Sequence, residues 1–129
     1  VILSGKNYGW PVITYGRNYN GSSITDKTRQ EGMEQPTYFW RPSTAVCGAS
    51  FYTGDMFPRW QNALLVSALK DEQVSVLLTE EDRVMHEEII LRSVGRVRQA
   101  VPGPDGAVYV ITNAPDQILR LSLIEERGY

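Results

Sequence analysis

Short apolar runs, separated by polar turn residues, fill the chain from about residue 46 onward. Seven of these runs alternate apolar and polar positions or are rich in β-branched and aromatic residues, as strands are. They are Ala49–Tyr52, Ala63–Leu69, Val74–Leu78, Val84–Leu91, Val97–Val101, Ala107–Thr112 and Ile118–Leu123. The run Val84–Leu91 contains Glu-Glu-Ile-Ile-Leu-Arg, which also suits a helical turn, but we interpret it as a strand. The pattern predicts an all-β fold.

The first 45 residues have a different character. They are rich in Gly, Asn, Tyr, Ser and Pro, and their apolar residues show little periodicity. The aromatic residues among them argue against a flexible linker, because such linkers consist mainly of small residues. Residues 1–45 are therefore predicted to form a long, structured connection, with at most short strands around Val12–Tyr15 and Thr37–Trp40.

An internal repeat predicts the architecture. Residues 63–77 align without a gap on residues 107–121, at an offset of 44 residues. The identical pairs are Ala63/Ala107, Val66/Val110, Gln73/Gln117 and Leu77/Leu121. Four short strands in a repeat of about 40–45 residues are typical of β-propeller blades. The sequence thus predicts a complete four-stranded blade over residues 46–92 and a partial final blade over residues 93–129, with a seven-stranded β-sandwich as the alternative.

Composition places the chain among ordinary globular proteins. Of its 129 residues, 42% are hydrophobic and 22% charged, and the net charge of −2 comes from 13 basic and 15 acidic residues. Both signs are scattered, so no basic stripe indicates a nucleic-acid partner. No apolar run reaches the roughly 20 residues of a membrane span. Cys47 is the single cysteine, which excludes an internal disulfide and a multi-cysteine zinc site.

Three cations lie where strands of successive blades begin or end. Lys70 follows the strand Ala63–Leu69, while Arg96 and Arg98 flank Val97 at the start of the next unit. With period-two alternation the two arginines share one face, and Val97 and Gln99 take the other. An Arg-x-Arg pair is by itself more often a solvated strand face than a site. If the three cations converge, however, they suit a ligand with several carboxylates, because guanidinium groups bind carboxylates bidentately. The implied ligand class is an anionic cofactor.

The remaining candidates have structural interpretations that compete with functional ones. Trp40 is either a buried anchor, which the sequence favours, or a flat surface for stacking. His86 has no visible catalytic partner, so we expect a solvated position on an outer strand. Cys47 is expected to be a small buried hydrophobe rather than a nucleophile.

Several Gly, Pro and acidic residues are expected to form turns. Residues 103–106 read Gly-Pro-Asp-Gly, which has the chemistry of a tight turn leading into a strand. Asp55, Asp71 and Glu72 are likewise interpreted as turn residues. Calcium binding is the lesser alternative for them, because the ligand spacing of a calcium loop is missing.

Seven segments, read in order, resemble one family. They are Gly5–Pro11, Met33–Trp40, Phe51–Asp55, Phe57–Trp60, Leu64–Lys70, Gly95–Arg98 and Gly103–Thr112. Their order and spacing resemble those of the soluble pyrroloquinoline-quinone-dependent glucose and aldose sugar dehydrogenases, over nearly the whole chain from Gly5 to Leu123. The resemblance implies a six-bladed β-propeller, of which this chain is roughly the carboxy-terminal third. It also implies a periplasmic or secreted location.

The resemblance assigns roles to four residues. Trp40 resembles the tryptophan beside the quinone, Lys70 the lysine that contacts it, and Arg96 and Arg98 the pair that binds its carboxylate and carbonyl oxygens. The implied reaction oxidises aldoses to lactones: a histidine takes the proton of the sugar hydroxyl while a hydride passes to the quinone, which a Ca²⁺ ion polarises. In the family that histidine and the metal ligands belong to earlier blades, so His86 has no such role.

One departure from the family lies close to the cofactor pocket. The family typically has Ala-Pro-Ser-Gly after the tryptophan segment, whereas residues 45–48 read Ala-Val-Cys-Gly.

Two blades need a partner, because each leaves a sheet edge and a face uncovered. We expect the remaining blades of the same polypeptide to cover them, with a homotrimer that closes a six-bladed ring as the second account. The expected function is the supply of part of a sugar dehydrogenase's cofactor site. The alternatives are a non-catalytic propeller piece with a binding or assembly role, and a family member that has lost its activity.

Overall fold

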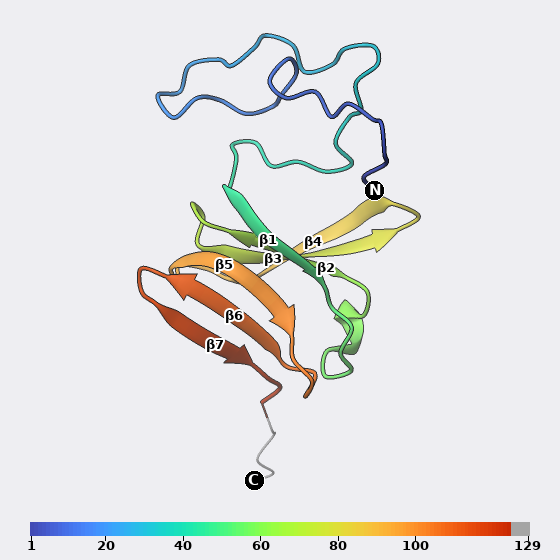
Figure 1. The fold of residues 1–129 in the computed structure, drawn as a ribbon. Helices are drawn as coiled ribbons and strands as arrows, with labels where there is room; N and C mark the ends of the chain where they lie inside the picture. The colour runs from blue at the N-terminus through green and yellow to red at the C-terminus, as the bar shows by residue number, and fades with distance from the viewer. Residues whose placement is uncertain (125–129) are drawn as a thin grey trace. The chain divides into compact units, whose positions relative to one another are not determined.

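The chain divides into two units, Val1–Ser43 and Thr44–Tyr129, which we describe separately. A computed structural model describes residues 1–124, and the second unit contains all seven strands (Figure 1). In the described part of the chain, no helix has both the length and the apolar character needed to cross a membrane.

The second unit consists of two antiparallel sheets. The first contains β1 (Val46–Phe51), β2 (Leu64–Ala68), β3 (Gln73–Glu80) and β4 (Arg83–Leu91), and the second contains β5 (Arg96–Pro102), β6 (Val108–Asn113) and β7 (Gln117–Leu121). All seven predicted strands are thereby confirmed, with bounds that differ by up to three residues. The helical alternative for the fourth run is excluded, because that run forms β4.

In both sheets the strands lie side by side in chain order (Figure 1). Such a meander is the arrangement of a propeller blade, whereas immunoglobulin-type sandwiches have Greek-key connections. The strand register also follows the repeat: Val66 pairs with Ser75, and 44 residues later Val110 pairs with Leu119. The gapless alignment of the sequence therefore corresponds to the same strand pairing in both sheets.

The first strands of the two sheets do not follow this offset. β1 starts at Val46 and β5 at Arg96, 50 residues apart. The difference is taken up by the long β1–β2 connection, which contains a short 3₁₀ helix, Pro58–Trp60. The indole Nε1 of Trp60 donates a 3.2 Å hydrogen bond to Glu88 Oε2, which holds this connection against β4.

The main core lies between the two sheets. Its residues have side chains with no exposed surface or almost none, and they come from both sheets and from the ends of the β1–β2 connection: Tyr52, Ala63, Leu65, Val74, Val76, Val97, Ala100, Val108 and Val110. Leu65 pairs with Val76 and Ala100 pairs with Val110. Since directly opposed residues in a ladder share a face, each sheet turns one apolar face toward the other.

The first unit is a loop held by local contacts. The rings of Tyr15 and Phe39 stack with centroids 3.9 Å apart, which agrees with a structured connection. The sequence allowed at most short strands around Val12–Tyr15 and Thr37–Trp40, and none forms: within residues 1–43 the structure has only an isolated bridge between Arg17 and Ser23. Turn contacts take the place of a ladder there. For example, the Gly16 N–H donates to the Thr14 hydroxyl oxygen.

Candidate cofactor site

Lys70 lies in the turn between β2 and β3, and its side chain is exposed. Its backbone N–H donates a 3.1 Å hydrogen bond to the carbonyl of Thr44, and the N–H of Leu69 donates to the carbonyl of Ala45 at 2.9 Å. These bonds continue the β1–β2 ladder beyond the pair Val46 and Ala68. They place Lys70 beside the start of β1.

The start of β5 carries the two arginines, and its ladder contains a bulge. Arg96 pairs with Asn113 and Val97 with Thr112, but the next pair is Gln99 with Ile111, so Arg98 is an extra residue on this strand. The strict alternation expected from the sequence is therefore wrong beyond Arg98. Because the bulge shifts the phase by one residue, Ala100 and not Gln99 joins Val97 in the core, each with 0% of its surface exposed.

Both arginine side chains remain exposed on the side of Asn113. Arg98 Nε donates a 2.7 Å hydrogen bond to Asn113 Oδ1, while Arg96 lies opposite Asn113 in the ladder. The bulge thus brings the side chains of two residues of β5 to one residue at the end of β6.

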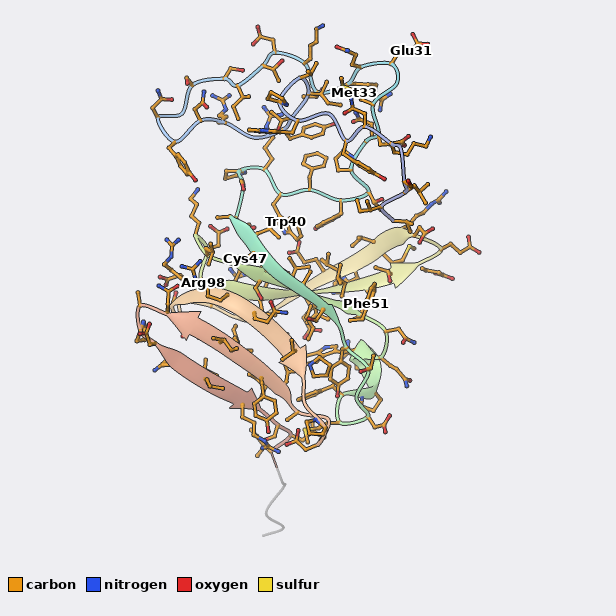
Figure 2. All side chains as sticks on the ribbon, in the orientation of Figure 1. Glu31, Met33, Trp40, Cys47, Phe51 and Arg98 are labelled. Atoms are coloured by element: carbon orange, nitrogen blue, oxygen red, sulfur yellow. The ribbon has the colours of Figure 1, made fainter. Side chains whose placement is uncertain are left out.

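β1 and β5 lie close together where Gly48 is located. A side chain on Gly48 would come within 2.6 Å of the Arg98 carbonyl oxygen and would overlap the Gln99 side-chain amide. Gln99 Nε2 also donates a 3.0 Å hydrogen bond to Ser50 Oγ on β1. Figure 2 shows Cys47 and Arg98 on these two strands, at the same end of the sheets. Lys70, Arg96 and Arg98 therefore belong to the end of the two sheets where β1 and β5 begin.

This end of the sheets carries both signs of charge. Asp71 and Glu72 follow Lys70 in the same turn, as expected for turn residues. Within residues 1–124, His, Cys, Asp and Glu side chains form no group of three or more that could hold a metal ion.

Trp40 belongs to the first unit. It is half-buried, and its ring packs edge-on against Tyr38 with centroids 5.0 Å apart. The cations lie in the second unit, so the stacking of Trp40 on a cofactor beside them stays a prediction.

The first unit also has a polar hollow of about 220 Å³. Arg17, Asp26, Thr28 and Arg41 are among its lining residues. None of the four residues predicted to contact the cofactor lines it.

The expectations for His86 and Cys47 have opposite outcomes. His86 is exposed on β4, the outermost strand of its sheet, so the prediction for this residue is confirmed. The prediction for Cys47 is wrong, because this cysteine is exposed and not buried. The register of β1 is irregular between Val46 and Ala49, so regular alternation does not fix the direction of Cys47; Gly48 approaches β5, while the Cys47 side chain is exposed.

Asn113 is the residue of this site that the sequence analysis missed. Counting outward from the turn at residues 103–106 puts Ala114 opposite Arg96, and only the bulge at Arg98 brings Asn113 there.

Most of the sequence matches one family. The family model described as Glucose / Sorbosone dehydrogenase matches residues 1–121. The chain belongs to this family. It is 43% identical over 122 residues to the aldose sugar dehydrogenase YliI of Escherichia coli (strain K12), a match that covers 92% of this chain and 33% of that protein. A protein of Synechocystis sp. described as uncharacterized, slr1608, is 35% identical over 123 residues and is covered to 30%. The chain thus spans about a third of the length of these relatives. That this is their carboxy-terminal third stays a prediction.

Solved structures of dehydrogenases have the same fold. A crystal structure of a glucose dehydrogenase matches with a TM-score of 0.85 and 39% identity, over 93% of this chain and 36% of that one. The apo-form of the soluble aldose sugar dehydrogenase from Escherichia coli matches with a TM-score of 0.76 and 38% identity, over 90% and 35%. The PQQ-bound aldose sugar dehydrogenase from Streptomyces coelicolor, with a TM-score of 0.62 and 20% identity, shows the fold alone. The two sheets are β-propeller blades, and the sandwich alternative is wrong.

Proposed function

We propose that this chain supplies part of the cofactor site of a quinone-dependent soluble sugar dehydrogenase, which oxidises aldoses to lactones. The observation that carries the proposal is the position of Lys70, Arg96 and Arg98, which come from two blades and belong to the same end of the sheets. The family membership and the aldose sugar dehydrogenase relative support the substrate class.

The residues at this end fit pyrroloquinoline quinone, which carries several carboxylates. Two guanidinium groups offer paired N–H donors to carboxylate or carbonyl oxygens, and Lys70 adds a point charge. Trp40 would offer its ring to the flat cofactor. When bound, the quinone accepts the hydride that leaves the sugar carbon. The part of this chain is to hold and orient the cofactor.

Other parts of the reaction come from outside this chain. By the family resemblance, the histidine that takes the sugar proton and the ligands of the Ca²⁺ ion belong to other blades. The partner we propose is therefore the remainder of the propeller in the same polypeptide, and the location is periplasmic or secreted. Our second candidate is a homo-oligomeric propeller subunit with a binding or assembly role. The open edge of β7 and the 73% exposure of Ile118 favour a contact of this kind.

A hybrid protein tests the proposal. In it, this chain replaces the matching third of the Escherichia coli aldose sugar dehydrogenase, and quinone binding and aldose-dependent dye reduction are measured with Ca²⁺ present. We expect both activities in the hybrid, and we expect the Arg96→Ala and Arg98→Ala variants to bind the quinone at least about tenfold more weakly. A folded hybrid that does not bind the quinone, or variants that bind it as the hybrid does, would overturn the proposal.

A further inference from the structure

Arg98 is held by an uncharged residue. Its Nε donates a 2.7 Å hydrogen bond to the amide oxygen of Asn113, the last residue of β6. The bond uses Nε and not the terminal Nη groups, which are the donors that form a fork with a carboxylate. The guanidinium is thus fixed in direction while its charge has no carboxylate partner in this bond.

A second arginine of the same sheet shows the contrast. Arg120 on β7 donates from Nε and Nη2 to Asp105 Oδ2, at 3.0 and 2.8 Å, and forms a salt bridge with it. Tyr109 donates its hydroxyl to the same oxygen. That guanidinium is neutralised by a carboxylate within the blade, and its contacts are those of a structural residue. Arg98 is oriented by a hydrogen bond to a neutral oxygen and forms no salt bridge with the residues that the structure describes, which leaves its charge available to attract an anion.

The amide at position 113 is not required by the blade itself. In the repeat, Asn113 corresponds to Leu69, which ends the equivalent run in the first blade, and Ala114 corresponds to Lys70. Both blades pair their second and third strands in the same register. A polar residue at position 113 therefore serves something other than strand pairing.

We propose that Asn113 is a positioning residue, which orients the Arg98 guanidinium toward an anionic ligand and preserves its positive charge. The inference rests on the proposed function, because the ligand is the carboxylate-bearing quinone of that site. An arginine that is already oriented loses less side-chain freedom on binding, so the ligand is bound more tightly. A carboxylate at position 113 would orient Arg98 as well, but it would cancel part of the charge and repel the ligand.

The experiment measures the dissociation constant of pyrroloquinoline quinone in the hybrid protein, by equilibrium titration at two salt concentrations. We expect Asn113→Ala to raise it roughly tenfold, with an unchanged thermal midpoint. We expect Asn113→Asp to raise the dissociation constant as well. The salt dependence of the dissociation constant should become weaker, because the net positive charge of the site falls. Arg120→Ala is the matched control on the same sheet. This variant should bind the quinone with the same dissociation constant as the unsubstituted hybrid.

A spectroscopic measurement on the same variants separates orientation from charge. The Arg98 Nε–H signal in nitrogen–proton correlation spectra of the hybrid protein should exchange slowly with water. It should exchange fast in Asn113→Ala and slowly again in Asn113→Asp, a rescue that a change in packing alone does not produce.

Two different failures are distinguishable. If Arg98→Ala weakens quinone binding and Asn113→Ala does not, the positioning role is wrong while the proposed function stands. If Arg96→Ala and Arg98→Ala also leave binding unchanged, the cofactor site is wrong and the positioning role falls with it. A variant at position 113 that unfolds is replaced by Asn113→Asp, whose side chain has nearly the same shape.

Discussion

The hydroxyl of Tyr52 donates a 2.6 Å hydrogen bond to the carbonyl of Gly106 and accepts one of 3.1 Å from the N–H of Phe57. Tyr52 follows β1, whereas Gly106 ends the turn between β5 and β6. This hydroxyl therefore joins the two blades where their first strands, β1 and β5, end. None of the Tyr52 surface is exposed.

The first prediction concerns this bond between blades. Tyr52→Phe keeps the ring in the core but leaves the Gly106 carbonyl and the Phe57 N–H without their partner. We expect the free energy of unfolding of the hybrid protein in urea to fall by about 1–3 kcal/mol, the usual cost of an unsatisfied buried polar group. Tyr109→Phe is the control, because the Tyr109 hydroxyl bonds only at the exposed Asp105–Arg120 pair, and its effect should be under about 1 kcal/mol. Equal losses in the two variants would contradict the prediction.

Gly48 carries the second prediction. A methyl group there would overlap the Gln99 side chain and lie 2.6 Å from the Arg98 carbonyl oxygen, a backbone atom that cannot move aside alone. Gly48→Ala should therefore push β1 away from β5, destabilise the second unit by about 1–3 kcal/mol and weaken quinone binding in the hybrid. Unfolding and titration measure the two effects.

The matched control for Gly48 lies in the first unit. A methyl group on Gly16 would have the Thr14 hydroxyl 3.3 Å away as its nearest neighbour, and Gly16 has no positive φ. Because this contact is to the end of one side chain of the first unit, Gly16→Ala should destabilise the second unit less than Gly48→Ala does and leave quinone binding unchanged. A stable, quinone-binding Gly48→Ala variant would show that the approach of β1 to β5 is not needed.

Sequence patterns located the strands because burial imposes them. Strands of both sheets contribute apolar residues to the core of the second unit, so alternation and the 44-residue repeat were visible without any tertiary information. The short strands that the sequence allowed around Val12–Tyr15 and Thr37–Trp40 do not form, because these residues pack in another way. Tyr15 and Phe39 are held by ring stacking, and apolar residues held in that way resemble a strand in a short window.

The arginine pair was found from sequence, but its surroundings were not. Counting from the turn at residues 103–106 assumes an unbroken ladder, and nothing in Arg96–Gln99 signals the bulge that brings Asn113 opposite Arg96. The prediction that Cys47 is buried was wrong for a similar reason. The exposure of Cys47 depends on which face of β1 meets β5, and the sequence does not show that. Gly48 sets that face, and its close contact with Arg98 is a property of the packed blades.

The third prediction is a pH dependence. The hydrogen bond from Arg120 lowers the pKa of Asp105 below its ordinary value, with further help from the hydroxyl of Tyr109. A depressed carboxyl pKa adds stability that is present above the ordinary pKa of about 4 and is lost as the pH falls through the lower folded value. Asp105→Asn should therefore lose stability relative to the unchanged chain at pH 5–7 and match it at the acid end, as measured by urea unfolding. The difference should also shrink in high salt, since the pair is exposed. A difference that persists at the lowest pH would contradict this origin.

The fourth prediction is that the 129-residue chain alone neither oxidises sugars nor binds the quinone tightly. Its cations can attract the cofactor, but the proton acceptor and the calcium ligands expected from the family lie in other blades, and charge alone does not position a reacting carbon. Mixing the purified chain with pyrroloquinoline quinone, Ca²⁺ and aldoses, and following a dye acceptor, tests this. Robust turnover by the chain would refute it.

The last prediction concerns assembly, and it follows from two surfaces of the second blade. Ile111 pairs directly with Ile118, so both lie on one face, and they are 41% and 73% exposed. β7 ends the three-stranded sheet, and its outer edge has no strand beside it in the described part of the chain. An open edge and an apolar pair favour association in water.

Two kinds of partner fit these surfaces. Since the chain spans about a third of its relatives, the remaining blades of a longer polypeptide would cover them, and this is the account we favour. Three copies in a head-to-tail ring would cover them as well, because two blades from each copy give six. Light scattering on the isolated chain distinguishes the two: aggregation supports the missing blades, whereas a stable trimer supports the ring. In a trimer, Ile118→Lys should place a charge in the contact and dissociate the ring, while Met85→Lys on the outer strand β4 should not. A well-folded monomer would contradict both accounts, because it would show that the open edge of β7 needs no cover.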